Sequence, residues 1–553
     1  MSADVLGPAG RGALRPTLVP DLVELAAARF RDPGNLTGGS PAALVEDSGR
    51  RLTWTDLEAE VARVATGLGD AGLVAGQRVL LVLGNRIELV TTYLGILRAQ
   101  LVAVPVNPAA KVEELAWMIA DSGARLVVAE AATVAQARAA TTVVRAALEG
   151  ARDVLDDEVV TRAREPRLVV VDSEPQDREL AFDALRADAA RTMPARPDPE
   201  TLACLLYTGS TTDLPRAAML SHRALLANIE QTTAVVPPMV RSDDVVLGVL
   251  PLFHVYGLIA VLGSVLRHGA TLVLVDHFDP HGTLDAITRH GVTVVPVAPA
   301  VFPHWLGLPD LAEALAPVRL VLSGSAPLSR SVIEEFFAAT GLTVQQGYGL
   351  TEAAPVVTST LASTAPVPGS LGVVLPGVGL RLVDDDGEQP EPGDPGEIQV
   401  RGANLFDGYW PDASGGPGAD GWWPTGDVGF LDDEGELSLV DRAAEVIVVT
   451  GFRVYPHEVE AAILQVPGVE AAAAIGVPDD ATGHAVVAYV RAPGRDPAQV
   501  ADAVRAHAEA VLAGFKRPAR VEVVDELPTT LAGRVRKGAL RQLDRRRALG
   551  ILE

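Results

Sequence analysis

Residues 78–84 read Arg-Val-Leu-Leu-Val-Leu-Gly, an apolar run that ends at a glycine, and the fold class follows from this run and its surroundings. A run of this kind is typical of a strand that is buried on both faces of a parallel sheet. The next residues alternate between helical and strand patterns: a helix over 88–100, a strand over 102–106, and a helix over 111–122 that closes at Gly123. This alternation predicts βαβ units and a mostly parallel sheet covered by helices.

The same alternation continues along the chain. Further strand-like runs occur at residues 126–129, 272–275, 292–295 and 320–323, and the alanine-rich residues 131–164 are predicted to form surface helices.

The later part of the chain has a different texture. Beyond residue 365, short strand-like runs alternate with Gly/Pro turns such as 384–387 and 390–393, which predicts a β-rich section. Residues 441–553 have their own pattern of strands and helices. We therefore expect an α/β fold with α+β sections. Its large N-terminal domain, residues 1–440, has parallel sheets covered by helices plus the β-rich section, and its small mobile C-terminal domain, residues 441–553, is α+β.

Composition excludes several classes of partner. A chain of 553 residues exceeds the size at which one core stops growing, so at least two domains are expected. The formal net charge of −25 argues against a nucleic-acid or anionic-membrane binder. Residues 516–553 carry ten Lys/Arg against five Asp/Glu, which fits either a contact with phosphates or a solvated helical surface. Cys204 is the only cysteine, so no intrachain disulfide can form and a reducing cytoplasm is the expected location.

One uncharged stretch, residues 245–266, has the length of a membrane span. It contains glycines, a proline and a histidine, which favour a strand, a loop and then a helix. We therefore expect no membrane span.

A loop rich in small and hydroxylated residues is the first candidate for chemistry. It reads Tyr207-Thr-Gly-Ser-Thr-Thr-Asp-Leu-Pro-Arg-Ala-Ala-Met219, between an apolar run at 202–206 and a helix expected from Ser221 onward. Such a loop can direct several backbone N–H groups and hydroxyls toward one anion. Asp213 opposes this use, because a carboxylate 4 Å from a phosphate charge costs about 1 kcal/mol in water and about 4 near a protein surface.

Further motifs follow this loop in a fixed order. They are Pro251-Leu-Phe-His254, Tyr348-Gly-Leu-Thr-Glu352, Gly396-Glu-Ile-Gln-Val-Arg-Gly402, Thr425-Gly-Asp427, and Asp441-Arg442 leading into Gly451-Phe-Arg-Val-Tyr-Pro-His-Glu458. Together they resemble the adenylate-forming superfamily of acyl-CoA ligases, nonribosomal adenylation domains and luciferases, over nearly the whole chain.

The resemblance implies a site for the AMP moiety of an acyl-adenylate. Tyr348 is expected to stack on adenine, because a flat ring suits a purine. Asp427 is expected to accept both ribose hydroxyls, since a carboxylate offers two acceptor oxygens. The implied AMP-binding residues are Gly324, Ser325, Ala326, Tyr348, Gly349, Thr351, Asp427 and Arg442.

The resemblance also implies roles in catalysis and in CoA binding. The catalytic residues are expected to be His254 beside the reacting carbonyl, Glu352 as the ligand of a Mg²⁺ ion, and Arg534. A lone histidine in an apolar run is also compatible with a satisfied core residue. The CoA site is expected at Gly451, Phe452, Arg453 and Lys516, and the hinge of the C-terminal domain at Ala444.

The phosphate loop departs from the family pattern Ser-Gly-Thr-Thr-Gly-x-Pro-Lys-Gly. Ser210, Asp213 and Ala217 replace the three glycines, and Arg216 replaces the lysine. Glycine permits close approach to phosphate, so side chains at these positions cost contact or add strain. We therefore expect a degenerate phosphate loop consisting of Thr208, Gly209, Ser210, Thr211, Thr212, Asp213 and Arg216.

The C-terminal domain departs as well. Arg534 stands where the family has a lysine that bridges the substrate carboxylate and the α-phosphate. The planar guanidinium of arginine is wider than the ammonium group of lysine, so it does not fit between the same two oxygens. Lys537 lies three positions further on, and Ala444 removes the usual charge at the hinge. Of 46 basic residues 43 are arginine, so a GC-rich genome accounts for the lost lysines, but it does not account for Ser210 and Asp213, since glycine codons are GC-rich too.

These departures favour one activity over two others. The preferred hypothesis is an acyl-CoA ligase homologue with impaired adenylation, which takes a preformed acyl-adenylate from a separate adenylating ligase and converts acyl-AMP and CoA into acyl-CoA and AMP. The first alternative is a complete ATP-dependent synthetase in which Arg534 is the cation. The second is a non-catalytic protein that binds AMP or the acyl-adenylate. The acyl group is expected to be apolar and bulky, as in secondary metabolism, from the surroundings of Val261, Val301, Leu322 and Gly347.

Overall fold

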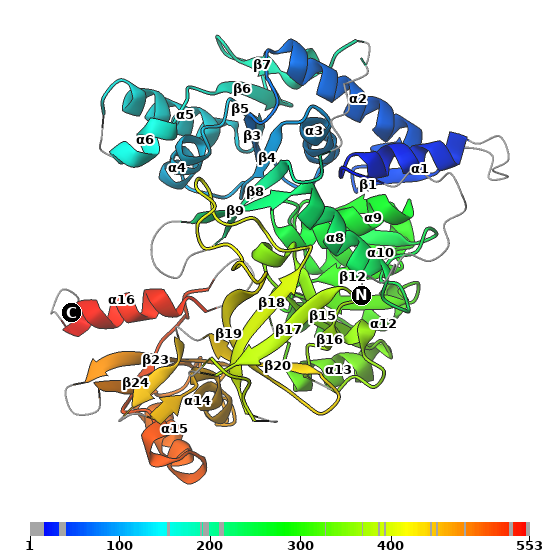
Figure 1. Cartoon of the computed structure of the whole chain (residues 1–553). Helices are drawn as coiled ribbons and strands as arrows, with labels where there is room; N and C mark the ends of the chain where they lie inside the picture. Colours follow the sequence, from blue (N-terminus) through cyan, green and yellow to red (C-terminus); the bar gives the residue numbers. More distant parts are fainter. Residues whose placement is uncertain are drawn as a thin grey trace.

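The computed structural model describes most of the chain. The described residues are 16–31, 40–151, 155–188, 191, 198–208, 215–326, 328–367, 369–384, 387–391, 394–442, 445–449, 452–479, 483–529 and 535–548. Within them the strands form four sheets, and helices cover the two large ones (Figure 1). The expected α/β fold, with large parallel sheets in the N-terminal part and a smaller C-terminal part, is confirmed.

The first sheet has seven strands and contains the run at residues 78–84. All neighbours in it are parallel except the last pair. In sheet order its strands are β7 (Leu180–Ala181), β6 (Arg167–Val171), β5 (Leu126–Glu130), β3 (Arg78–Val82), β4 (Val102–Pro105), β8 (Leu202–Thr208) and β9 (Arg216–Ser221).

Helices pack on both faces of this sheet, as its continuous apolar strands require. Val79 and Leu81 share a core with α2 (Trp54–Asp70) and α3 (Ile87–Arg98), whereas Leu80 shares a core with the helices on the opposite face. Those helices are α4 (Val112–Ser122) and α5 (Val134–Leu148), and α4 ends at Gly123 with a left-handed φ of 58°, as the sequence predicts.

Strand β9 corrects one expectation. The sequence predicts one loop over residues 207–219, but Arg216–Ser221 is a strand that pairs antiparallel with β8, and Thr208 lies opposite Arg216. The run Arg-Ala-Ala-Met-Leu-Ser has no β-branched residues, so its local pattern does not predict a strand, and its pairing partner β8 comes earlier in the sequence. The helix expected from Ser221 is α8 (His222–Thr233), with Ser221 as its N-cap.

The second sheet has nine strands, with a parallel centre and antiparallel edges. Its strand β12 begins two residues later than the predicted 292–295. In sheet order the strands are β16 (Val373–Val374), β15 (Val356–Ser359), β14 (Val344–Gly349), β13 (Leu320–Ser323), β12 (Val294–Val297), β10 (Val245–Gly248), β11 (Thr271–Leu274), β1 (Ala42–Glu46) and β2 (Arg51–Thr53).

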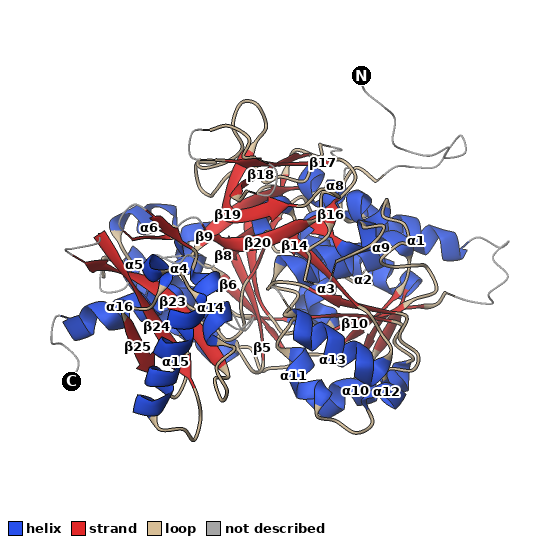
Figure 2. Ribbon diagram, turned by 90° about the horizontal axis from the view of Figure 1, so that it is seen from below, coloured by secondary structure: helices blue, strands red, loops and turns tan. Residues whose placement is uncertain are grey.

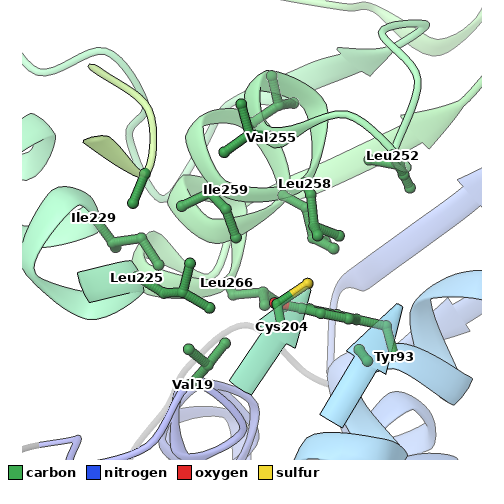
Figure 3. Close-up of a cluster of buried hydrophobic side chains, with 14 of the residues drawn as sticks. Val19, Tyr93, Cys204, Leu225, Ile229, Leu252, Val255, Leu258, Ile259 and Leu266 are labelled. Atoms are coloured by element: carbon green, nitrogen blue, oxygen red, sulfur yellow. The ribbon is translucent and has the colours of Figure 1, made fainter. Parts of the chain in front are cut away.

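Residues 245–266 form the expected strand, loop and helix. After β10, a π-helix, η1 (Tyr256–Gly263), continues into α9 (Ser264–His268). Leu258 and Ile259 of this segment lie in one buried cluster with Cys204 of β8 and Tyr93 of α3 (Figure 3). Among the described residues, no helix has the length and apolar character needed to cross a membrane.

The remaining helices of the N-terminal part lie mostly around these two sheets (Figure 2). They are α1 (Asp21–Arg31), α6 (Asp157–Arg162), α7 (Phe182–Leu185), α10 (Pro280–His290), α11 (Val301–Leu306), α12 (Leu311–Ala314), α13 (Arg330–Thr340), η2 (Thr351–Ala353) and η3 (Thr360–Ala362).

The β-rich section predicted beyond residue 365 is an antiparallel sheet of four strands (Figure 1). Its strands are β17 (Val378–Val383), β18 (Gly396–Gly402), β19 (Trp423–Leu431) and β20 (Leu437–Arg442).

The C-terminal part has its own sheet and its own core, which contains Ile447, Val459, Ala488, Val490 and Val504. The strands of the sheet are β22 (Phe452–Val454), β21 (Ile447–Val449), β24 (Gly483–Arg491), β23 (Ala471–Asp479) and β25 (Arg520–Val523). Its helices are α14 (Pro456–Ile463), α15 (Pro497–Val511), η5 (Gly514–Lys516) and α16 (Lys537–Ala548).

The domain boundary expected between residues 440 and 441 stays a prediction.

The basic tail contains α16, whose Arg545, Arg546 and Arg547 are exposed, and Arg547 lies 3.2 Å from Glu522.

Candidate functional site

Tyr348 and Asp427 form a buried pair between two sheets. Tyr348 lies on β14 and Asp427 on β19, and the Tyr348 hydroxyl donates a 2.7 Å hydrogen bond to Asp427 Oδ2. The two residues are 5% and 9% exposed. The Tyr348 backbone N–H donates to Thr358 Oγ1, and the Asp427 N–H donates to Thr425 Oγ1. Both residues predicted to hold the nucleoside are therefore fixed relative to one another.

Arg442, which the resemblance also assigns to the nucleoside, lies on the neighbouring strand. It is the register partner of Asp427 in the β19–β20 ladder, so the two backbones are adjacent.

The glycines around Tyr348 are required by close packing of the backbone. A Cβ at Gly347 would lie 2.5 Å from the Thr358 carbonyl oxygen, and a Cβ at Gly349 would lie 2.3 Å from the Pro355 carbonyl oxygen. The close approach of the neighbouring strand β15 therefore accounts for the glycine at position 347. The sequence-based expectation of a roomy acyl pocket at Gly347 is not needed to explain this residue. Thr351, from the same motif, begins η2 and is partly buried.

Residues 324–326 follow the carboxyl end of β13. A Cβ at Gly324 would lie 2.6 Å from Cε1 of Tyr256, so the Tyr256 ring packs directly against this backbone. Ser325 has a left-handed φ of 74°, and Ala326 follows it. Sequence reasoning missed Tyr256, although an aromatic residue two positions after His254 marks it. Burial raises the pKa of the Tyr256 hydroxyl.

His254 lies in the loop between β10 and η1. Its Nδ1 accepts a 3.3 Å hydrogen bond from the Tyr256 backbone N–H, which leaves Nε2 as the protonated nitrogen of a neutral ring. Desolvation lowers the pKa of His254, although its side chain is accessible to solvent. A lowered pKa and a solvent-accessible side chain together fit a position on the wall of a concave site. There the surrounding protein displaces most of the water, but the ring can still be reached from solvent.

The residues proposed to surround the acyl group divide between two hydrophobic cores. Val261 and Leu322 belong to the same core as Tyr348, whereas Val301 belongs to a separate core with Phe336 of α13. Val301 is therefore not placed with the other two by packing.

Glu352, Tyr409 and Arg216 form a chain of contacts on the phosphate side. The Tyr409 hydroxyl donates a 2.6 Å hydrogen bond to Glu352 Oε1, and the Arg216 guanidinium carbon lies 3.6 Å from the centre of the Tyr409 ring. Glu352 is 8% exposed, whereas Arg216 is exposed. Sequence reasoning missed Tyr409, because nothing in its local pattern marks a contact with residues so far away in the chain.

The residues present fit a magnesium ion held jointly with a nucleotide. Mg²⁺ is usually bound by one or two carboxylates together with substrate phosphates, so Glu352 alone is a sufficient protein donor. Among the described residues, no group of three His, Cys, Asp or Glu side chains is arranged to hold a metal.

The ends of the phosphate loop are joined by a short antiparallel pairing. Thr208 Oγ1 donates a 3.2 Å hydrogen bond to the Arg216 carbonyl oxygen. The other residues assigned to this loop, Gly209, Ser210, Thr211, Thr212 and Asp213, lie outside the described residues.

Two lysines of the C-terminal part are engaged in ion pairs. Lys516 Nζ lies 2.6 Å from Glu458 Oε2. Lys537 is 9% exposed and its Nζ lies 3.3 Å from Glu445 and 2.9 Å from Glu460. In this arrangement the charge of the Lys537 ammonium is balanced by the two carboxylates.

The other predicted residues of this part are described incompletely. The backbone of Phe452 and Arg453 forms part of β22. Arg534, Ala444 and Gly451 lie outside the described residues.

Comparisons with known proteins cover nearly the whole chain. A family model described as AMP-binding enzyme matches residues 32–410, and one described as AMP-binding enzyme C-terminal domain matches residues 458–534. A long-chain-fatty-acid–CoA ligase of Escherichia coli O157:H7 is 33% identical over 539 residues, which are 94% of this chain and 93% of the relative. The 4-coumarate–CoA ligase 5 of Oryza sativa subsp. japonica is 33% identical over 516 residues, which are 90% of this chain and 91% of the relative.

Solved structures agree with these matches. ATP-bound MatB from Rhodopseudomonas palustris superposes with a TM-score of 0.81 at 31% identity, over 94% of this chain and 98% of that one. The anthranilate CoA ligase AuaEII in complex with anthranoyl-AMP superposes with a TM-score of 0.81 at 25% identity, over 96% of this chain and 98% of that one.

Proposed function

Because the chain belongs to the AMP-binding enzyme family, we propose that it is an acyl-CoA ligase that forms a thioester from a preformed acyl-adenylate and CoA. The products are acyl-CoA and AMP. The observation that carries this proposal is the buried and hydrogen-bonded Tyr348–Asp427 pair, which contrasts with a phosphate loop that has side chains at the three glycine positions of the family pattern.

The reaction asks for positioning more than for acid–base chemistry. The CoA sulfur attacks the carbonyl carbon of the adenylate, the C–S bond forms, and the bond from that carbon to the phosphate oxygen breaks. AMP leaves with the electron pair, and the thiol proton passes to solvent. AMP is already a good leaving group, so holding the thiol against the carbonyl supplies most of the rate.

Each residue has a role in this scheme. Tyr348 and Asp427 hold the adenosine, and Arg442 assists at the ribose. His254, as a neutral ring on the wall of the site, borders the reacting carbonyl. The CoA is guided by the C-terminal domain, which turns about its hinge at Ala444, and the residues that contact CoA are Gly451, Phe452, Arg453 and Lys516.

The adenylate must come from elsewhere if this chain does not make it. A separate adenylating ligase supplies it, and the acyl group is apolar and bulky. We locate the protein in the cytoplasm.

A complete ATP-dependent synthetase is the second candidate. The 33% identity to a CoA ligase of Escherichia coli O157:H7 and the likeness to ATP-bound MatB favour it. In that case Arg534 would act as the cation between the carboxylate and the α-phosphate, and Glu352 would hold a Mg²⁺ ion that would supply positive charge at the phosphates.

The experiment that separates these candidates compares two substrate pairs. Synthetic acyl-adenylates and CoA form one pair, and the free acids with ATP, Mg²⁺ and CoA form the other, across a panel of bulky and linear acids. Thioester from the first pair without pyrophosphate from the second is the expected result. No thioester from any adenylate would overturn the proposal, and binding of AMP without turnover would indicate a non-catalytic binding protein.

A further inference from the structure

Tyr409 connects two charged groups that the phosphate side of the site offers. Its hydroxyl is bonded to Glu352 and its ring lies under Arg216, so one side chain contacts both. No role for Tyr409 follows from the residues that carry the family resemblance.

The contact with Glu352 is short and directional. An O–H···O distance of 2.6 Å is in the range of a charge-assisted hydrogen bond to a carboxylate. Because Glu352 is 8% exposed, water does not easily replace the phenol as the donor. The hydroxyl therefore fixes the position of Oε1, and with it the direction in which the carboxylate can bind a cation.

The contact with Arg216 places a cation beside the same ring. A guanidinium 3.6 Å from a ring centre is well within the range of a cation–π interaction. Arg216 begins β9, so its backbone is held by the pairing with β8 at the end of the phosphate loop.

The backbone of Tyr409 is tied to the same strand. The N–H of Met219 donates to the Gly408 carbonyl oxygen, and the N–H of Trp410 donates to the Ala217 carbonyl oxygen. Between these two hydrogen bonds, Ala218 and Tyr409 are partners in an antiparallel β-bridge. The segment 407–410 thus pairs with β9, so the backbone that carries the Tyr409 ring is fixed relative to the strand that begins at Arg216.

We propose that Tyr409 is a positioning residue that sets Glu352 and Arg216 for the cation and the phosphates of a bound nucleotide. This inference rests on the second candidate function, the ATP-dependent synthetase, because it assumes that the site binds ATP together with Mg²⁺.

The test measures how much Mg²⁺ strengthens ATP binding. Affinity for ATP is determined by equilibrium dialysis in EDTA and in saturating Mg²⁺, for the wild-type chain, Tyr409→Phe, Glu352→Gln and the double variant. We expect Mg²⁺ to tighten binding about tenfold in the wild type and about twofold in Tyr409→Phe, since a hydrogen bond to a charged group is lost. The double variant should lose no more than Glu352→Gln alone, because the hydroxyl acts through that carboxylate.

Two further variants separate positioning from folding. Tyr409→Leu should also weaken ATP binding in EDTA about threefold, because Arg216 loses the ring beneath it. Tyr489→Phe is the matched control, since the Tyr489 hydroxyl also bonds a carboxylate, that of Asp544, in the C-terminal part. It should keep the full effect of Mg²⁺.

Three results would overturn the role of Tyr409: a full Mg²⁺ effect in Tyr409→Phe, additive losses in the double variant, or no Mg²⁺ effect in the wild type. Failure of thioester formation from acyl-adenylates would overturn the proposed function instead, whatever the Mg²⁺ result.

Discussion

At the nucleoside side of the site, Tyr348 and Asp427 are almost excluded from solvent and joined by a 2.7 Å hydrogen bond. At the phosphate side, Arg216 is exposed and rests on a ring, and the loop before it carries Asp213 where the family pattern has glycine. The first side is preorganised for its ligand, so binding costs little rearrangement. In the sequence, the second side carries Asp213, whose charge has the same sign as that of phosphate. Under the proposed function, this difference predicts a site better suited to an adenylate than to ATP.

The largest effect is expected from breaking the nucleoside side. Asp427→Asn removes the charge that the ribose hydroxyls and Tyr348 use, and each such hydrogen bond contributes about 1.5–3 kcal/mol. We expect kcat/KM for acyl-adenylate to fall about 10²–10³-fold, measured by thioester formation. Asp433→Asn, at an exposed aspartate six positions further on, is the control and should behave as wild type. A folded Asp427→Asn variant with wild-type kcat/KM would contradict the role of this side.

Acid is expected to loosen the scaffold behind the phosphate side. His222 begins α8 directly after β9, is 2% exposed, and its Nδ1 accepts from the Val19 N–H. Burial lowers its pKa from 6.5 to about 4. The folded state therefore holds the neutral ring, and its contribution is complete above pH 6.5 and lost as the pH falls toward 4.

The shift of His222 corresponds to about 3 kcal/mol of unfolding free energy across that window. Urea unfolding between pH 7.5 and 4 measures it. His222→Gln should flatten the pH dependence, whereas His277→Gln, at an exposed histidine, should not. His254 and His268 have pKa values lowered by burial too, so some dependence should remain. An unchanged slope in His222→Gln would refute this assignment.

Restoring a glycine in the phosphate loop should strengthen ATP binding. Asp213→Gly removes a carboxylate from the phosphate loop, and we expect ATP to bind about tenfold more tightly. Asp213→Glu keeps the charge and serves as the matched control. Affinity for ATP in Mg²⁺ is the measurement, and equal affinity in wild type and Asp213→Gly would show that the charge does not oppose ATP.

The smallest effect is expected from Tyr348→Phe. The ring is kept and only the hydroxyl bonded to Asp427 is lost, so KM for acyl-adenylate should rise about threefold with kcat unchanged. Steady-state kinetics test this. A lowered kcat would place Tyr348 closer to the reacting atoms than the pair with Asp427 implies.

Much of the fold follows from local pattern. The strands at 78–82, 102–105 and 126–130 and the helix at 112–122 are continuous apolar or 3.6-periodic runs, and they form as predicted. Strand β9 does not follow, because its pairing with β8 and with residues 407–410 is decided by tertiary contacts. The order of strands in the two large sheets has the same origin.

The candidate site divides along the same line. Four candidate residues belong to motifs that are visible in the sequence: Tyr348, Asp427, Glu352 and His254. Their roles stay predictions. Tyr409 could not be found in this way, because its significance lies in contacts with residues 57 and 193 positions away in the chain.

We propose that the site binds an acyl-adenylate more tightly than ATP. Calorimetry with a non-hydrolysable acyl-sulfamate analogue of the adenylate, and separately with ATP and Mg²⁺, tests it most directly. We expect the analogue to bind at least about a hundredfold more tightly than ATP, which is a difference of about 2.7 kcal/mol in the free energy of binding. Comparable affinities for the two ligands, with pyrophosphate released from ATP and acid, would contradict it.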